Sequence, residues 1–378
     1  MKNFYSNLIK YGLTSQIITQ AEAFEEFHIA RVSEQHRNIY KVISEQGELS
    51  ATISGKFAFE AQSQLDYPAV GDWVMIDRAD DEAGNAIIHS VLQRKSLFTR
   101  QAAGTSNDLQ VIASNIDIVF ICMSLNADFN LRRVERYLAI AWDSMATPVI
   151  VLTKSDLCSD LEEKLFELSS VSIGVEVVVT SAEDALNSAH ESDHSYNEHS
   201  GQESGYEGVE KYIKEGCTIV FIGSSGVGKS TLINRLFGEE VLKTNEIRGD
   251  DDKGRHTTTH RQLLLLPNGG VVIDTPGMRE IQIGVGDLSK TFEDIEELID
   301  ACKYSDCSHG NEPGCKVQEA ISNGDLSQER FDSYQKLQRE IAYSSMNSRQ
   351  LENDKISRMF GSKSEMKQFM DEIKNKNK

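Results

Sequence analysis

"VFIGSSGVGKSTLINRLFG", residues 220–238, joins an apolar strand, a glycine-rich turn and an amphipathic helix. Within it, Gly223, Gly228, Lys229 and Ser230 have the full spacing of a phosphate-binding loop. The glycines let backbone N–H groups point at phosphate oxygens, beside a helix N-terminus whose partial positive charge favours anions. The stretch therefore predicts a nucleotide site in an α/β domain.

The positions of this loop have expected roles toward a nucleoside triphosphate. Lys229 is expected to bridge the β- and γ-phosphates and to assist catalysis, and the hydroxyl of Ser230 is expected to bind Mg²⁺. The residues expected to contact the nucleotide are Gly223, Ser224, Ser225, Gly226, Val227, Gly228, Lys229, Ser230 and Thr231.

A second phosphate motif, "VVIDTPG", follows at residues 271–277. Asp274 ends the predicted strand, where a carboxylate can hold Mg²⁺ through a water, and Gly277 can offer its N–H to the γ-phosphate. Alone, D-T-P-G would also fit a β-turn. Its distance from the phosphate-binding loop favours the nucleotide role.

A base-recognition motif lies upstream, at the end of the predicted strand "VIVLTKSD". It looks like the N/T-K-x-D motif of GTPases. The Asp156 carboxylate can accept hydrogen bonds from guanine N1–H and the exocyclic amine, which adenine does not offer in that arrangement. The Lys154 stem can lie along the base, and a backbone N–H after the next strand can meet guanine O6. The expected base contacts are Thr153, Lys154, Ser155, Asp156, Ser181 and Ala182.

The order of these motifs is base recognition, then phosphate loop, then D-T-P-G, which is the reverse of the usual arrangement. Ligands bind at the carboxyl ends of strands in such sheets, so the site depends on where the strands lie in space. A circular permutation preserves that placement, and permutation is tolerated because domain termini often lie close together. The sequence predicts a circularly permuted α/β P-loop GTPase core.

The rest of the chain suggests two further domains, making the protein multidomain. Residues 1–100 hold five short, partly alternating segments, which predict an OB-like β-barrel, although the pattern does not separate it from an SH3-like barrel. Residues 101–285 alternate strand and helix, which predicts a mostly parallel sheet covered on both faces. Residues 286–378 are predicted to form a helical domain. The polar, acidic stretch at about 183–210 is typical of a flexible surface insertion.

Four potential metal ligands fall close together after the permuted core. Cys302-x₄-Cys307-x-His309-x₅-Cys315 supplies three thiolates and one imidazole. Zn²⁺ favours such closed tetrahedral sets in structural sites. The alternative, separately buried thiols, does not explain the density of the cluster. The sequence predicts one structural Zn²⁺ in the helical domain.

The composition constrains the partners and the compartment. The formal net charge of −20 argues against non-specific nucleic-acid binding by the whole surface, but not against local basic patches. The longest apolar runs are of strand length, far short of a membrane span. The first residues lack the apolar region of a signal peptide. We therefore expect a cytoplasmic protein without a membrane partner.

Taken together, the chain resembles the circularly permuted, ribosome small-subunit-dependent GTPase A (RsgA) family over nearly its whole length. The resemblance rests on "TKSD", "GSSGVGKSTLIN", "GRHTTTH", "DTPGMRE" and "CKYSDCSHGNEPGC". It implies an N-terminal OB-fold, a permuted GTPase core and a C-terminal zinc-binding helical domain. It also implies a role in late maturation of the small ribosomal subunit, binding of its rRNA, and GTP hydrolysis to GDP that the particle stimulates. We expect the free chain to be monomeric.

Two departures from common GTPase patterns affect the chemistry. Thr153 stands where Asn is usual, which removes an amide contact and is expected to soften guanine selectivity. Met278 occupies the position where many GTPases carry a water-orienting Gln. We therefore expect His256, in the loop at 249–260, to position the attacking water, with Thr258 completing the Mg²⁺ shell. Arg255 is a candidate phosphate contact. The alternative is that His256 and Arg255 are surface residues of a mobile loop.

Two other functions compete with this interpretation. A metabolic P-loop enzyme, such as a nucleotide-dependent kinase, would need an acceptor pocket and leaves the T-K-x-D and S-A motifs unexplained. A non-catalytic RNA-binding scaffold that senses nucleotide is compatible with Met278. Guanine preference argues against the first, and stimulated turnover against the second.

Overall fold

The structure, a computed structural model, describes most of the chain. The described residues are 5–36, 39–80, 82, 84–101, 109–181, 205–242, 261–274, 288–310, 312–345, 350, 364–365 and 367–368. Most of the acidic stretch 183–210 lies outside these residues. So do several predicted site residues, namely Ala182, Arg255, His256, Thr258, Gly277 and Met278.

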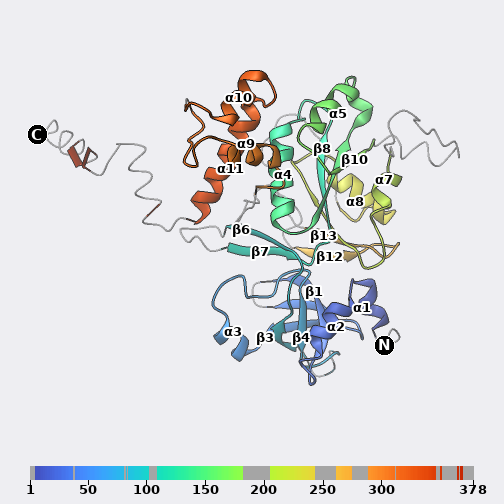
Figure 1. Cartoon of the computed structure of the whole chain (residues 1–378). Helices are drawn as coiled ribbons and strands as arrows, with labels where there is room; N and C mark the ends of the chain where they lie inside the picture. The colour runs from blue at the N-terminus through green and yellow to red at the C-terminus, as the bar shows by residue number, and fades with distance from the viewer. Residues whose placement is uncertain are drawn as a thin grey trace, which may run out of the picture.

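A five-stranded barrel forms the N-terminal part of the molecule, at the bottom of Figure 1. The strands pair in the order β1-β2-β3-β5-β4, and β4 returns to pair with β1. Only β3 and β5 are parallel, which requires a crossover, as in a Greek-key OB barrel. This confirms the OB-like prediction. The elements are α1 (Ser6–Lys10), α2 (Ser15–Ala21), β1 (His28–Gln35), β2 (Tyr40–Ile43), β3 (Glu48–Ile53), α3 (Gly55–Glu60), β4 (Trp73–Ile76) and β5 (Ala86–Val91).

The barrel strands are buried on both faces where other elements cover them. In β1, Ala30 and Val32 belong to the core inside the barrel. The alternate residue Ile29 belongs instead to the larger core that includes Leu8 and Ile17 of the two N-terminal helices. Alternation along a strand places these side chains on opposite faces. Strand β1 therefore joins two cores.

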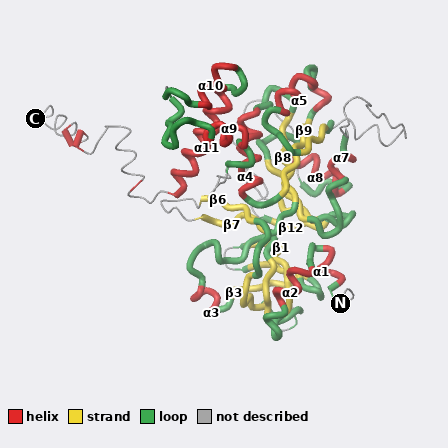
Figure 2. Tube along the Cα trace, in the orientation of Figure 1, coloured by secondary structure: helices red, strands yellow, loops and turns green. Residues whose placement is uncertain are grey.

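The central sheet continues from the barrel, since β12 pairs with β1 through Glu34 and Gln262 (Figure 2). Its order is β10-β9-β8-β11-β13-β12, and all neighbours are parallel except β12 and β13. This confirms the predicted mostly parallel sheet. Its elements are β8 (Ile118–Ser124), α4 (Leu131–Asp143), β9 (Thr147–Thr153), the 3-10 turn η1 (Ser155–Leu157), α5 (Leu161–Ser169), β10 (Glu176–Val179), α7 (Glu207–Glu210), β11 (Thr218–Ile222), α8 (Lys229–Phe237), β12 (Gln262–Leu265) and β13 (Val271–Asp274).

Helices cover both faces of this sheet. Val119 and Ile121 of β8 share a core with α4 and α5. The alternate residues Phe120 and Cys122 share another core with α7 and α8. Burial on both faces explains why β8 is an almost continuous apolar run.

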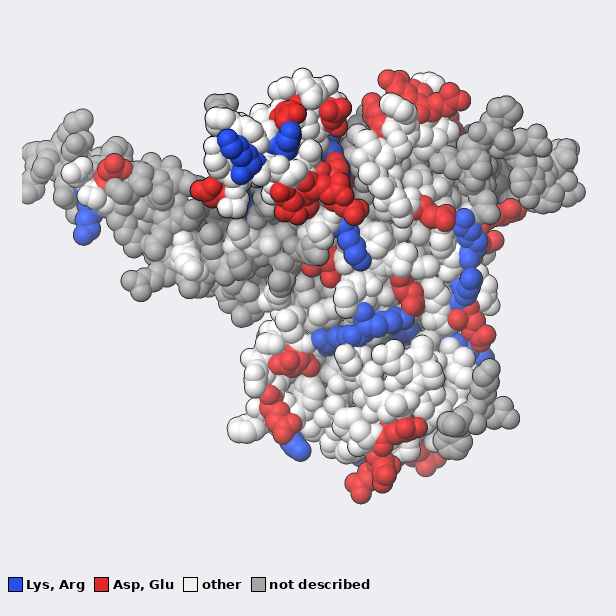
Figure 3. Space-filling view, viewed as in Figure 1, with Lys and Arg blue, Asp and Glu red and all other residues white. Residues whose placement is uncertain are grey.

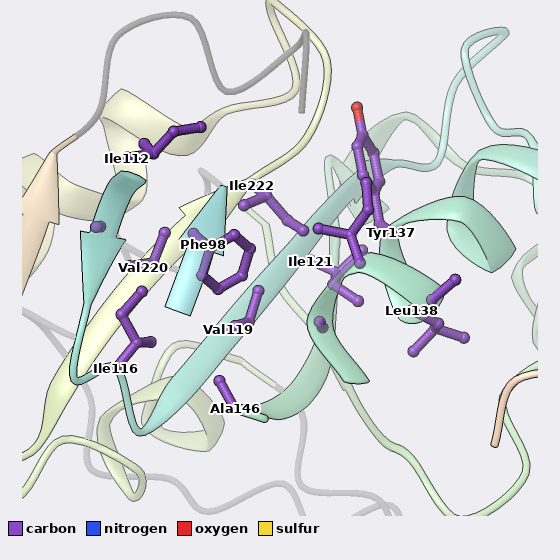
Figure 4. Packing of buried hydrophobic residues seen from close by; sticks show 14 of the residues in the cluster. Phe98, Ile112, Ile116, Val119, Ile121, Tyr137, Leu138, Ala146, Val220 and Ile222 are labelled. Carbon is purple, nitrogen blue, oxygen red and sulfur yellow. The ribbon is translucent and has the colours of Figure 1, made fainter. Parts of the chain in front are cut away.

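Helix α4 is fixed at its start and along its apolar face. The side chain of Asn130 accepts a hydrogen bond from the Arg133 N–H (3.1 Å) and caps the helix. Tyr137 and Leu138 then pack near the strand residue Ile121 (Figure 4). The first turn of α4 consequently has a defined position at the carboxyl edge of the sheet.

A two-stranded hairpin and a helical region complete the molecule (Figure 1). Helix α11 buries Phe331, Tyr334 and Leu337, which lie at helical spacing. It is also bound to α4 by charge, because Arg330 contacts the fully buried Glu135 at 2.8 Å. The elements are β6 (Leu97–Gln101), β7 (Leu109–Ser114), α9 (Glu293–Asp300), α10 (Lys316–Asn323) and α11 (Gln328–Ser345).

Acidic side chains gather at the end of the molecule opposite the barrel, over α5 and near α9 (Figure 3). The acidic residues in the first turns of these helices lie near the positive end of the helix dipole. Within the described part of the chain, no helix combines the length and apolar character needed to cross a membrane.

Candidate nucleotide-binding site and cysteine–histidine cluster

The glycine-rich loop between β11 and α8 wraps around the ammonium group of Lys229. Lys229 Nζ donates hydrogen bonds to the carbonyl oxygens of Gly223 (2.8 Å) and Ser224 (2.6 Å). Gly223, Gly226 and Gly228 have φ values of 145°, 73° and 96°, a region that side chains rarely adopt. The loop therefore has the shape of an anion-binding nest, with its N–H groups at the N-terminus of α8.

The base motif is joined directly to this loop. Thr153 ends β9 and is buried, and its hydroxyl donates a 2.6 Å hydrogen bond to the carbonyl oxygen of Val227. Lys154 follows in the left-handed conformation, with φ of 60°. The threonine that departs from the usual asparagine thus bonds to the phosphate loop itself. From the sequence we expected only the loss of an amide contact at this position, and nothing in it indicated the hydrogen bond from Thr153 to Val227.

Asp156 and Ser181 meet although they are far apart in sequence. Ser181 Oγ donates a 2.9 Å hydrogen bond to Asp156 Oδ1. Parallel pairing of β9 and β10 brings their carboxyl ends together, and the backbone bond from Ser155 N to Thr180 O (3.3 Å) holds the two loops. Asp156 is exposed, so its carboxylate is accessible to a ligand.

Asp274 ends β13, the neighbour of β11, and so lies at the same edge of the sheet. Burial raises the pKa of the Asp274 carboxyl, and the nearby charge of Lys229 offsets this only in part. A carboxylate destabilised in this way gains from a cation beside it. The donor chemistry and the location therefore fit Mg²⁺.

Two residues outside the sequence motifs also reach the loop. Asp128 Oδ2 accepts hydrogen bonds from Ser224 Oγ (2.8 Å) and from Arg133 Nη1 (2.8 Å). Burial acts to raise the pKa of Asp128, but the bonds from Arg133 and Ser224 outweigh it, and the pKa lies below its usual value. No motif spacing marks Asp128 and Arg133, so sequence analysis missed them.

The four predicted metal ligands form one cluster between α9 and α10. The sulfur atoms of Cys302, Cys307 and Cys315 and a ring nitrogen of His309 all lie within 4.8 Å of one another. His309 Nδ1 is 3.6 Å from Cys302 Sγ and 3.7 Å from Cys315 Sγ. Three thiols and one imidazole at these separations suit the tetrahedral N/S coordination that Zn²⁺ prefers.

Neighbouring groups orient the ligands of this cluster. The backbone N–H of Lys316 points at Cys302 Sγ (3.4 Å), and that of Gln318 points at Cys315 Sγ (3.5 Å). The side-chain amide of Gln318 donates a 2.8 Å hydrogen bond to the carbonyl oxygen of His309. Such outer bonds fix metal ligands in place. The donor set and its surroundings therefore fit a closed, structural zinc site, separate from the nucleotide motifs.

Comparison with known proteins agrees with this arrangement. The family described as RsgA GTPase matches residues 91–192 and 193–284. A Lactiplantibacillus plantarum protein named "Small ribosomal subunit biogenesis GTPase RsgA 2" is 52% identical over 363 residues, which are 96% of this chain and 97% of that relative. A Listeria innocua protein named "Small ribosomal subunit biogenesis GTPase RsgA 1" is 46% identical over 89% of this chain and 90% of its own.

Solved structures show the same fold. YjeQ from Thermotoga maritima is 28% identical, with a TM-score of 0.59, and the match covers 84% of this chain and 99% of that one. YloQ, described as a circularly permuted GTPase, is 22% identical, with a TM-score of 0.55, and the match covers 85% of this chain and 96% of that one. The permuted order of motifs, the P-loop sheet and the matches over most of the chain lead to one conclusion: the chain belongs to the RsgA GTPase family.

Proposed function

We propose that this chain hydrolyses GTP to GDP and phosphate and acts in biogenesis of the small ribosomal subunit. The observation that carries the proposal is the joining of base and phosphate motifs at one edge of the sheet, through the bond from Thr153 to Val227. The partner is suggested by the names of relatives up to 52% identical over most of the chain.

The base motif selects guanine in this proposal. Asp156 accepts hydrogen bonds from N1–H and the exocyclic amine of the base, and Lys154 lies along its face. Ser181 and Ala182 present a backbone N–H to guanine O6. Adenine offers Asp156 no matching pair of donors, and a site left unpaired in this way discriminates strongly.

The phosphate loop, residues 223–231, holds the phosphates through its N–H groups, and Lys229 bridges the β- and γ-phosphates. Ser230, Asp274 and Thr258 would hold Mg²⁺, which neutralises the charge that develops on the phosphates. Gly277 donates its N–H to the γ-phosphate.

His256 positions the attacking water in this proposal. Met278 stands where a glutamine would do so in other GTPases, and a thioether cannot orient water. Turnover is then slow until a partner orders the segment that carries His256. The small subunit, through contacts with its rRNA, is the partner we infer.

The proposal extends to the domains, the metal and the state of the free chain. Residues 1–100 form the barrel domain, residues 101–285 the nucleotide domain and residues 286–378 the helical domain. Cys302, Cys307, His309 and Cys315 would hold one structural Zn²⁺. With all four positions taken by protein, the metal stabilises the region and supplies no reactive water. We infer that the chain acts in the cytoplasm and is monomeric when free.

The test is multiple-turnover hydrolysis of GTP and of ATP, with and without purified small ribosomal subunits. Stimulation restricted to GTP supports the proposal, and Lys229→Ala, measured in parallel, excludes a contaminating hydrolase. Equal use of ATP points to a metabolic P-loop enzyme. Guanine binding without stimulated turnover points to a nucleotide-sensing RNA-binding scaffold.

A further inference from the structure

A closed triangle of hydrogen bonds lies beside the phosphate loop. Arg133 Nη1 donates to Ser224 Oγ and to Asp128 Oδ2, both at 2.8 Å, and Ser224 Oγ donates to Asp128 Oδ2 at 2.8 Å. The serine hydroxyl therefore uses its hydrogen and a lone pair, one with each member of the ion pair. Its orientation is fixed from both sides.

The ion pair itself is held by a rigid part of the chain. Asn130 caps α4 through the Arg133 N–H, which fixes the backbone from which the arginine extends. The Asp128 N–H donates a 3.0 Å hydrogen bond to the side chain of Asn126, which shapes the preceding loop. One turn after Arg133, Arg136 pairs with Glu340 of α11 at 2.5 Å, so this second arginine bonds to another helix rather than to the triangle.

The triangle leads directly to the phosphate-binding lysine. The carbonyl oxygen of Ser224, whose side chain the ion pair holds, accepts the 2.6 Å hydrogen bond from Lys229 Nζ. A shift of Ser224 would thus move one of the two carbonyl groups that aim the ammonium group. We propose that Arg133 and Asp128 are positioning residues that hold Ser224, and through it Lys229, ready for the β- and γ-phosphates. This inference rests on the proposed function and extends its site beyond the sequence motifs.

The exposure of the pair separates this role from a contribution to overall stability. The side chains of Arg133 and Asp128 are 31% and 39% exposed. Ion pairs so open to water contribute little to the stability of a fold. Loss of the pair should therefore act on the phosphate loop and leave the fold almost unchanged. In the bound state the phosphates themselves hold Lys229. Loss of the pair should therefore lower nucleotide affinity more than it lowers kcat.

The experiment measures GDP affinity by titration calorimetry, with KM and kcat for GTP. Arg133→Met keeps an unbranched stem and removes the donors, and Ser224→Ala removes the hydroxyl. Each is expected to weaken GDP binding and to raise KM about 5–10-fold, with kcat changed less than about twofold, the range expected for loss of one ordinary hydrogen bond. Arg136→Met is the matched control on the same helix and should bind GDP like the wild type.

The double variant decides whether Arg133 acts through Ser224. If it does, Arg133→Met with Ser224→Ala binds GDP no more weakly than either single variant, because both remove the same contact. Additive losses, or wild-type binding by Arg133→Met, would overturn the inference while leaving GTP hydrolysis intact. A wild-type chain that is folded but binds no GDP would overturn the proposed function first.

Discussion

The phosphate loop and the cysteine–histidine cluster are built in different ways. The loop is held by residues distant in sequence: Thr153 lies 74 positions from Val227, and Asp128 lies 96 positions from Ser224. In the cluster, Cys302 and His309 are seven positions apart. The loop is therefore a product of the tertiary fold, whereas the cluster is a local structure within one short segment of the chain.

The difference predicts what each region depends on. Protein contacts help to shape the loop, since the carbonyl oxygens of Gly223 and Ser224 accept hydrogen bonds from Lys229. Ionised thiols in the cluster repel one another unless a cation lies between them. Removing the metal should therefore affect the helical region strongly, whereas removing single contacts should weaken the loop in smaller steps.

The largest effect is expected from loss of the metal. Cys315→Ser keeps a hydroxyl that can cap α10 in place of the sulfur, so it isolates the metal ligand from the helix cap. Structural zinc contributes apparent binding energies of about 10 kcal/mol in small domains. We expect Cys315→Ser to lose zinc by atomic absorption and α9–α11 to lose protection in hydrogen exchange. Cys217→Ser, outside the cluster, should keep one zinc per chain; a full metal content in Cys315→Ser would contradict the assignment.

The next largest effect should follow Gly223→Ala. A Cβ atom there would lie 2.4 Å from the carbonyl oxygen of Cys122, in a backbone conformation with φ of 145°. Backbone strain of this kind costs about 1–3 kcal/mol, and the clash with β8 displaces the loop. We expect loss of measurable GDP binding in calorimetry and a lower urea midpoint.

Gly238→Ala separates strain from clash for this prediction. Gly238 also has positive φ, at 71°, but a Cβ there meets nothing within 4 Å. It should be moderately less stable and bind GDP normally. Equal behaviour of the two variants would show that the contact with Cys122 is unimportant.

A smaller effect is expected at Thr153, which joins the two motifs. Thr153→Val has nearly the same shape but leaves the Val227 carbonyl without its partner, which costs about 1–2 kcal/mol. GDP affinity should fall about 5–30-fold. Thr153→Ser retains the hydroxyl and should bind within a few-fold of the wild type. If Thr153→Val and Thr153→Ser bound GDP with similar affinity, the hydrogen bond from Thr153 to Val227 would not support nucleotide binding.

The smallest expected effect concerns stability and pH at Asp274. Burial raises the pKa of the Asp274 carboxyl in the folded chain. As the pH rises, the carboxyl therefore ionises at a lower pH in the unfolded chain than in the folded chain. Ionisation therefore opposes folding, starting near the ordinary value of about 4. Without Mg²⁺, Asp274→Asn should have the higher urea midpoint at pH 7, and the gain should vanish near pH 4. The exposed Asp156→Asn should show no such gain; a stability loss for Asp274→Asn at pH 7 would contradict the prediction.

Local patterns in the sequence predicted much of this architecture. Apolar alternation indicated the five barrel strands, and the alternation of strand and helix indicated the mostly parallel sheet. Side-chain spacing identified all four members of the cysteine–histidine cluster, because the group spans a single turn-rich segment. These features depend on residues near one another in the chain.

The features that the sequence did not reveal depend on distant pairings. The parallel β3–β5 contact distinguishes the OB-like barrel, and no local pattern encodes it. The Thr153 hydroxyl and the Asp128–Arg133 pair reach the phosphate loop only because β8, β9 and β11 are neighbours. The roles of His256, Thr258, Gly277 and Ala182, outside the described residues, stay predictions.

The strand order also has a consequence for synthesis on the ribosome. Strands β8, β9 and β10 leave the exit tunnel before β11, which must then pair with the open edge of β8. A nascent chain of this length carries its base motif but has no phosphate loop, so bound nucleotide cannot assist folding at that stage. Strand β12 pairs with β1 later still. Exposed strand edges attract other chains, so the nascent protein is open to chaperones and to misassembly until these late strands emerge.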